Sequence, residues 1–457
     1  MILRDRWWWA LLVGGGVLFA AAPTSPGVAL GLGLLAGVAL GRPALLPPLV
    51  LLAAPFYLQA RPLFGRAVGP VEVLIVLTLV GAGVAWWRAG RPRPPLTPAD
   101  GLPLAFVVLG LLSLLASRVL APSLRELRTV ILEPVLFAGA TLWLYRERSP
   151  QPLLGGLVAG AVLAALLGLG QFVTGQDLIT AEGVARIRGP YVVQPGNLGS
   201  PNNLALWLER ALPICISYAV LSVGGWRWLA LGVAGVLGLA LFLTYSLGGW
   251  LAAALGMLGV VVGAGRWRLA GGLLVGLGVV GGVAALAFPE RVVGHFQAED
   301  STTLMRLQVW QAAWAMVRDH PVQGIGLDNF LYLYRDRYLP PAGWREPHLS
   351  HPHNLLLDFW LRLGLGGPVV LGLTLGWLGR WLWRLSRAGP LPERTVALGV
   401  AGSLLAGLVH GLVDNSYFLP DLALHFWGSF AIVRVLASRT ERASPSPWPR
   451  CQPEESV

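Results

Sequence analysis

The stretch 152–173, PLLGGLVAGAVLAALLGLGQFV, holds no charged residue and is long enough to cross the hydrocarbon core of a bilayer as one helix. Comparable apolar runs recur along the chain. Hydrophobic residues make up 55% of the 457 residues, charged residues only 12%, and the mean hydropathy is +0.64. A water-soluble domain of this length needs far more charge to cover its surface. The sequence therefore predicts an all-α, polytopic transmembrane helical bundle.

The apolar runs predict about 12 to 14 spans in one membrane domain over residues 1–437. They lie near 7–22, 27–41, 44–58, 68–87, 101–118, 124–145, 152–173, 202–223, 226–245, 248–264, 268–288, 354–385, 395–414 and 418–437. The runs 27–41 and 44–58 are short and interrupted by Pro and Gly, which is also typical of a re-entrant pair. Residues 438–457 are rich in Ser, Pro and Glu and are predicted to form a disordered cytoplasmic tail.

The basic residues predict the orientation of these spans. The net charge is +11, and all 34 basic residues are arginines. Most of them fall in one set of alternating short loops, whereas the opposite short loops hold chiefly Arg61 and Arg66. Because arginine-rich loops stay on the cytoplasmic side, both termini are expected in the cytoplasm. This distribution follows membrane orientation, so nucleic-acid binding is not expected.

Two longer extracytoplasmic segments interrupt the pattern, at 174–201 and 289–353. The second contains five of the seven histidines, namely His295, His320, His348, His351 and His353. Long loops between spans are where function tends to collect. The loop 289–353 is therefore the predicted location of the active site.

Within this loop, residues 300–319 predict an amphipathic helix. Asp300, Ser301 and Thr302 offer an N-cap, and Pro321 ends the helix before a reversal at Gly324 and Gly326. A helix with one apolar stripe can lie flat at the membrane surface. The stripe predicted here consists of Leu307, Trp310, Trp314 and Val317.

The sequence HLSHPHN, residues 348–354, stands where the chain re-enters the membrane. A neutral imidazole at this point can act as a general base, because the pKa of histidine lies near ambient pH. Two other interpretations stay open. The histidines can cap the helix that begins near Asn354 or lie in water, or His348, His351 and His353 can bind a metal ion. No acidic or cysteine ligand lies at a nearby spacing, which argues against the metal.

Several motifs together resemble the O-antigen ligase/polymerase family. They are RLQVW at 306–310, DHPVQGIGLDNF at 319–330, and His353-Asn354 followed after nine residues by Gly364 and then Gly367. The family also tends to carry segments similar to RGP at 188–190 and PNNLA at 201–205. One departure is Leu247, which stands where the family usually has an arginine that is held to bind the lipid diphosphate. Arg186, Arg188 or Arg210 would have to supply that charge instead.

The resemblance implies a metal-independent glycosyltransferase of lipopolysaccharide or polysaccharide biosynthesis in the bacterial cytoplasmic (inner) membrane, with no cofactor. The donor would be a glycan on undecaprenyl diphosphate, and the acceptor a sugar hydroxyl on lipid A–core or on another glycan. His353 would be the catalytic base, and Arg306 would contact the diphosphate, with Arg186 and Arg188 as further candidates. The alternatives are a polymerase of the same family and a non-enzymatic, transporter-like membrane protein. A transporter is expected to show an internal repeat and charged or broken helices near the membrane midplane, and no convincing repeat is visible.

Overall fold

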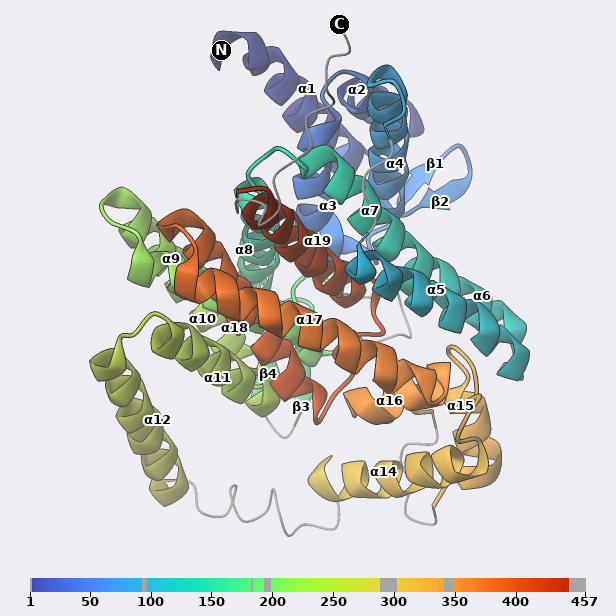
Figure 1. Cartoon of the computed structure of the whole chain (residues 1–457). Coiled ribbons are helices and arrows are strands. Elements are labelled where there is room, and N and C mark those ends of the chain that lie inside the picture. Colours follow the sequence, from blue (N-terminus) through green and yellow to red (C-terminus); the bar gives the residue numbers. More distant parts are fainter. Residues whose placement is uncertain are drawn as a thin grey trace, which may run out of the picture.

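The computed structural model describes residues 2–92, 97–181, 184–192, 199–287, 302–340 and 348–443. The described chain is built from helices and two short antiparallel hairpins (Figure 1). The elements up to the middle of the chain are α1 Ile2–Ala21, α2 Ser25–Gly41, η1 Pro43–Leu45, α3 Leu46–Ala53, η2 Ala54–Phe56, β1 Arg61–Leu63, β2 Arg66–Val68, α4 Pro70–Arg88, η3 Pro98–Asp100, α5 Gly101–Ser113, η4 Leu114–Ala116, α6 Leu120–Glu126, η5 Leu127–Leu132, α7 Glu133–Tyr145 and α8 Gln151–Thr174. The later elements are β3 Ile179–Ala181, β4 Val184–Arg186, α9 Pro201–Leu221, α10 Gly225–Leu243, α11 Leu247–Gly263, α12 Trp267–Ala287, α14 Thr302–Asp319, α15 Phe330–Leu333, η6 Tyr334–Tyr338, α16 Leu355–Leu363, α17 Gly366–Ala388, α18 Leu391–Gly411 and α19 Pro420–Ala443.

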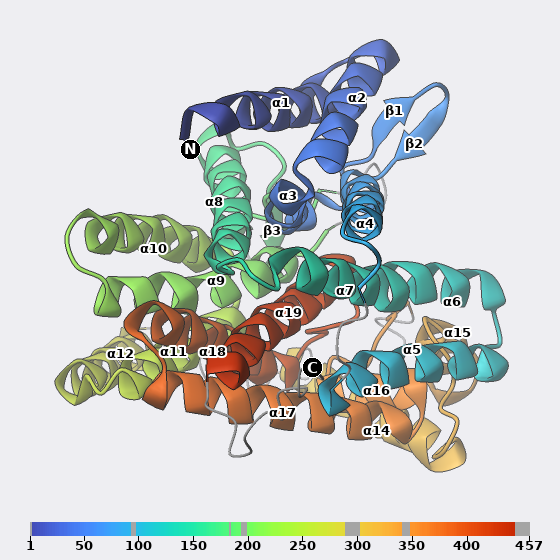
Figure 2. The ribbon, with the colours of Figure 1, turned by 45° about the horizontal axis from the view of Figure 1, so that its top comes forward.

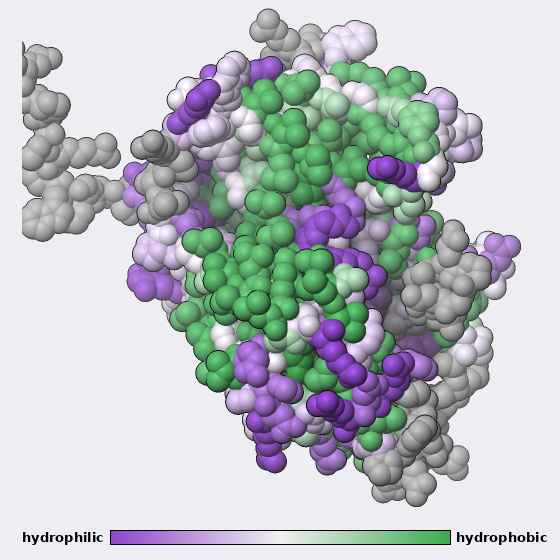
Figure 3. All heavy atoms as spheres, turned by 90° about the vertical axis from the view of Figure 1, so that its right-hand side faces the viewer, coloured by the Kyte–Doolittle hydropathy of each residue, from purple (hydrophilic) through white to green (hydrophobic). Residues whose placement is uncertain are grey.

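Length and hydropathy support a bundle that crosses a membrane several times. Among the described residues, seven helices pass both criteria, or up to eight if the bent pair 25–41 and 43–56 is one span. That pair turns by 118°, at the place where the sequence predicts a re-entrant pair. Exposed leucines cover α5 and α6, and Figure 3 shows a broad apolar surface on that side of the molecule. These features confirm the polytopic, all-α fold.

Close helix packing in the interior depends on small residues. Helix α9 is the most enclosed of the candidate spans, with 78% of its apolar window buried. At the contact between α8 and α3, a Cβ on Gly156 would lie 2.1 Å from the carbonyl oxygen of Pro48. At the contact between α11 and α18, a Cβ on Gly256 would lie 2.6 Å from the Gly402 carbonyl oxygen. Such positions let two helix backbones approach each other without a side chain between them.

The predicted span 354–385 is wrong as a single helix. The structure divides it into α16 and α17, with Gly364 between them at φ +66°. A Cβ on Gly364 would lie 1.9 Å from the Val322 carbonyl oxygen, so the chain after α14 packs directly on this break. The break brings α14 and α16 together at one end of the molecule, away from α1 and α2 (Figures 1 and 2).

The predicted helix 300–319 is observed as α14, although residues 300 and 301 lie outside the described residues. Contact of its predicted apolar stripe with the membrane surface stays a prediction. Val317 is buried, but Leu307 and Trp314 are more than 40% exposed. The buried face is instead formed by Val309, Ala312, Ala313, Met316 and Val317, which pack with residues 325–334 and Leu361. Contact with this neighbouring segment, not the helical period alone, decides which face is buried.

A buried ion pair fixes the helix that follows the histidine segment. The Arg362 guanidinium on α16 contacts the Glu126 carboxylate on α6 and donates to Asp358 Oδ1 at 2.7 Å. All three side chains are buried. Arg125 and Arg128 on the same segment are exposed and pair with Asp328 and with Glu72 and Glu133. The buried pair therefore connects α6 to α16 across more than two hundred residues of sequence.

We expect Arg362→Met to lower the stability of the folded protein by about 3–5 kcal/mol, because it leaves the carboxylates of Glu126 and Asp358 buried without their cation. Thermal unfolding in detergent measures the effect. Arg128→Met is the matched control, since it removes a half-exposed pair and is expected to cost at most about 1 kcal/mol. Equal losses in the two variants would contradict this role for the buried pair.

Candidate active site

The carboxylate of Asp414 lies at the centre of the candidate site. Asp414 is buried in the loop between α18 and α19. One oxygen, Oδ1, lies 2.9 Å from His353 Nδ1 and 3.7 Å from His351 Nε2. The other, Oδ2, accepts a hydrogen bond from Asn202 Nδ2 at 3.1 Å and lies 3.9 Å from Arg306. Three segments distant in sequence thus meet on one acid, at the end of the molecule that carries α14, α16 and the β3–β4 hairpin (Figure 1).

The backbone around His353 is held in an unusual conformation. His353 has φ +52°, a backbone conformation that residues other than glycine rarely adopt. Trp310 Nε1 on α14 donates to its carbonyl oxygen at 3.3 Å. The next residue, Asn354, caps α16 by accepting from the Leu357 amide, and its own amide donates to the Leu412 carbonyl oxygen. Asn354, and not a histidine, is therefore the helix cap. Strain of this kind persists only where several contacts enforce it, and it is common at functional sites.

The ionised carboxylate of Asp414 determines which atom of His353 donates the hydrogen bond between them. Burial of Asp414 opposes its ionisation, but the neighbouring His351, the hydrogen bond from His353 and the nearby His410 hold the pKa of Asp414 well below its usual range. An ionised carboxylate can only accept, so His353 Nδ1 carries the hydrogen and donates it to Oδ1. In the neutral ring, Nε2 of His353 is then a lone-pair acceptor. Burial and the neighbouring His353 lower the pKa of His351, which favours its neutral form.

A second layer of polar groups lies beneath Asp414. His410 Nε2 on α18 is 3.9 Å from Asp414 Oδ2, and His410 Nδ1 is 2.6 Å from Glu209 on α9. A Cβ on Gly248, at the start of α11, would lie 2.8 Å from His410 Nε2. The position of Leu247 is therefore adjacent to a glycine that packs directly on this layer.

The structure separates the arginines that the sequence offers as diphosphate contacts. Arg306 faces Asp414, as described above. Arg186 donates from Nε to the Thr244 carbonyl oxygen at 2.7 Å and from a terminal nitrogen to Asn202 Oδ1 at 3.2 Å. Arg188 is buried and donates instead to the Asp177 carbonyl oxygen. Arg210 is buried against Glu209 and Ser416. Arg306 and Arg186 are thus joined to the cluster, Arg210 lies beneath it against Glu209, and Arg188 is turned away.

The other histidines of the loop differ in position. His351 shares the Asp414 carboxylate with His353, and their rings are 4.2 Å apart. His320 lies 3.4 Å from the Gln323 amide and makes no contact with Asp414. His348 is exposed, and His295 lies outside the described residues.

Three side chains of the cluster could also hold a metal ion. The ligand atoms of His351, His353 and Asp414 lie within 4.8 Å of one another. The lack of an acidic ligand at a nearby spacing in the sequence therefore does not argue against a metal ion, because the fold supplies Asp414 from 61 residues away. The Arg306 guanidinium beside the same carboxylate opposes a divalent cation by charge repulsion.

Sequence reasoning did not identify Asp414, Asn202, Glu209 or His410 as parts of the site. Asp414 stands at the predicted end of an apolar run, where a polar residue is ordinary. The one available signal was the run Asp414-Asn415-Ser416 between two spans, on the same predicted side as the histidines.

Comparison with known proteins gives one family. Residues 230–372 match the O-antigen ligase family, a range that includes Arg306, His353, Gly364 and Gly367 but not Arg186 or Asp414. An O-antigen ligase of Salmonella typhimurium is 23% identical over 188 residues, which covers 37% of this chain and 41% of that protein. The matched part thus spans well under two thirds of the relative's length. The chain is therefore a multi-pass membrane protein whose residues 230–372 are similar to the O-antigen ligase family.

Proposed function

We propose that this protein transfers a glycan from undecaprenyl diphosphate to a sugar hydroxyl at the outer face of the cytoplasmic membrane. The observation that carries the proposal is the placement of His353 and Arg306 on the single carboxylate of Asp414. A base for a hydroxyl and a cation for a diphosphate are the two groups this reaction needs. The name of the Salmonella relative and the matched family support the same chemistry.

The reaction forms a bond between the acceptor hydroxyl oxygen and the anomeric carbon of the donor glycan, and it breaks the bond from that carbon to the diphosphate oxygen. His353 Nε2 takes the hydroxyl proton, and Asp414 holds the ring in the required tautomer and stabilises the imidazolium that forms. Undecaprenyl diphosphate leaves with the bonding electron pair. The Arg306 guanidinium stabilises the negative charge that develops on the leaving diphosphate.

The proposed reaction needs no metal ion. In many phosphate-transfer sites a divalent cation neutralises the leaving group. Here a guanidinium lies beside the base, and it can meet the same charge without a metal. We place both termini in the cytoplasm and the loops 174–201 and 289–353 outside. The acceptor is lipid A–core for a ligase or another glycan for a polymerase, and the length of the product distinguishes the two.

Arg186 is the second proposed diphosphate contact, and it replaces the charge absent at Leu247. Its Nε is bound to the carbonyl oxygen of Thr244, two residues before Ser246, which caps α11. Its terminal nitrogen bonds Asn202, whose amide donates to Asp414. The guanidinium of Arg186 is therefore held close to the turn that contains Leu247. It is connected through Asn202 to the carboxylate that orients His353.

We expect Arg186→Gln to reduce transfer by about 10- to 100-fold, since it removes one cation from the leaving group. The assay is transfer of a lipid-linked glycan by purified protein, with folding checked by thermal unfolding. Arg188→Gln, which changes an arginine turned toward Asp177, is expected to lose far less activity per correctly folded molecule. Adding Leu247→Arg to Arg186→Gln is expected to restore part of the loss. If Arg188→Gln is the more damaging of the two single variants, the assignment of Arg186 is wrong.

A further inference from the structure

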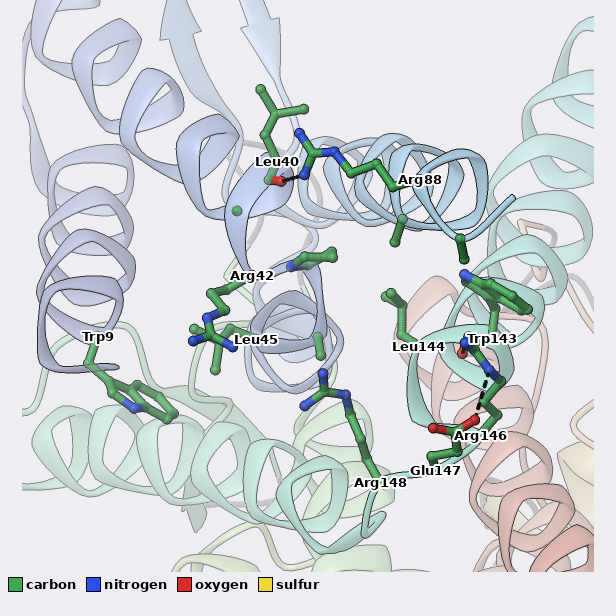
Figure 4. A pocket seen from close by; sticks show the side chains of 15 residues that line it. Trp9, Leu40, Arg42, Leu45, Arg88, Trp143, Leu144, Arg146, Glu147 and Arg148 are labelled. Atoms are coloured by element: carbon green, nitrogen blue, oxygen red, sulfur yellow. Dashed lines mark hydrogen bonds and ion pairs between the residues drawn. The ribbon is translucent and has the colours of Figure 1, made fainter. Parts of the chain in front are cut away.

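A pocket of 630 Å³ lies among the C-terminal ends of α2, α4 and α7, next to Trp9 on α1. Four arginines line it, Arg42, Arg88, Arg146 and Arg148, against one acid, Glu147. Figure 4 shows Arg42 and Arg148 extending into the space between these helix ends, with Trp9 and Trp143 on the two sides. The pocket is thus strongly basic and bounded by aromatic rings.

Arg88 and Arg146 contact the walls of the pocket. Arg88 donates to the Leu40 carbonyl oxygen at 2.7 Å, at the end of α2. Arg146 stacks on the Trp143 ring at 3.7 Å, donates to the Trp143 carbonyl oxygen and lies 3.5 Å from Glu147. Such contacts satisfy the unpaired carbonyl groups at helix ends. None of these contacts involves the Arg148 side chain.

The Arg148 guanidinium makes no side-chain hydrogen bond or ion pair with any residue that the structure describes. It extends toward Arg42, although two guanidinium groups repel each other. Arginines at the cytoplasmic ends of spans are common for reasons of orientation alone. A pocket that gathers four arginines around one acid goes beyond this bias, because it offers an anion several guanidinium groups at once.

Tryptophans indicate the depth of the pocket in the membrane. Trp7, Trp9 and Trp87 on α1 and α4 are more than half exposed. Exposed tryptophans of multi-pass proteins gather at the level of the lipid headgroups. Basic pockets between transmembrane helices at that level suit the phosphates of anionic lipids.

The pocket lies on the opposite side of the membrane domain from the candidate active site. Helix α8 begins at Gln151, shortly after Arg148, and ends at Thr174 before the hairpin that carries Arg186. A helix of 24 residues is about 36 Å long. Ligands of the pocket are therefore separate from the donor and acceptor of the proposed reaction.

We propose that this pocket binds the phosphate-bearing headgroup of an anionic phospholipid of the cytoplasmic leaflet, with Arg148 and Arg42 as the principal phosphate contacts. The four arginines and one acid favour a lipid with two phosphates, such as diphosphatidylglycerol. The inference stands independently of the proposed glycan transfer.

The test is lipid binding by the full-length protein in detergent, measured by native mass spectrometry and by the rise in unfolding temperature. The probes are diphosphatidylglycerol, phosphatidylglycerol, phosphatidylcholine, inorganic phosphate and pyrophosphate. We expect the two anionic lipids to bind and phosphatidylcholine to bind much more weakly. Arg148→Gln is expected to weaken anionic-lipid binding about fivefold and Arg42→Gln/Arg148→Gln about 25-fold, from the contribution of one surface charge.

Arg227→Gln is the matched control. It removes an exposed arginine on the same side of the molecule, at the start of α10 and outside the pocket, and is expected to leave binding unchanged. Unchanged binding by correctly folded Arg148→Gln, or equal binding of phosphatidylcholine, would overturn the proposal. Tight binding of pyrophosphate without lipid would overturn the lipid source and assign the pocket to a soluble phosphate ligand.

Discussion

His353→Ala is expected to reduce glycan transfer by a factor of about 10²–10⁴, the usual contribution of a positioned general base to hydroxyl attack. The loss is expected in kcat more than in KM, because the imidazole acts on the proton in the transition state and contributes little to donor binding. Steady-state transfer from a lipid-linked glycan by purified protein measures both parameters.

His320→Ala is the control for this experiment. His320 lies in the same loop, but it contacts Gln323 and not Asp414. It is expected to keep activity within a few-fold of wild type, so equal losses in the two variants would remove the special role of His353. Full activity in correctly folded His353→Ala would show that the base assignment is wrong.

Asp414→Asn is expected to lower kcat by a comparable factor, about 10²–10⁴, although it preserves the shape of the side chain. Asn can turn its amide NH₂ toward His353 Nδ1, which then accepts instead of donating. The ring hydrogen moves to Nε2, where it blocks uptake of the hydroxyl proton. The substitution also removes the negative charge that holds Arg306 beside the base.

The comparison for Asp414→Asn is Asp336→Asn. Asp336 pairs with Arg118 and Arg335 in a half-exposed setting, so its loss is expected to leave transfer unchanged. A purely structural role for Asp414 predicts a different pattern, in which activity falls only as far as the fraction of folded protein falls. Normal kcat in folded Asp414→Asn would therefore contradict the orientation of His353 by this carboxylate.

The fold class followed from the sequence because a single water-soluble core cannot bury so many hydrophobic runs of bilayer length. The C-terminal end of α14 and the reversal at Gly324 and Gly326 were also predictable, since both depend on local signals; the two glycines have φ of +68° and +88°. The break between α16 and α17 was not predicted, because residues 354–385 are largely apolar on both sides of Gly364. Only the close approach of the Val322 carbonyl reveals why the helix stops there.

The candidate site likewise contains some residues that the sequence predicts and others that it does not. His353 and Arg306 were found because they stand in motifs of one contiguous loop. Asp414 is 61 residues beyond His353, and its local sequence offers only the short polar run Asp414-Asn415-Ser416 as a signal. Which of Arg186, Arg188 and Arg210 approaches the cluster depends on side-chain direction in a hairpin and a buried helix, which residue spacing does not determine.

The most direct test of the proposed function is transfer of an undecaprenyl-diphosphate-linked glycan to a sugar acceptor by purified wild-type protein, with and without a strong metal chelator. The proposed mechanism predicts transfer at the same rate in both conditions, with loss of activity in His353→Ala under each. Loss of wild-type activity on chelation, restored by a divalent ion, would instead assign His351, His353 and Asp414 to a metal site. Absence of transfer from every lipid-linked donor would contradict the proposed reaction itself.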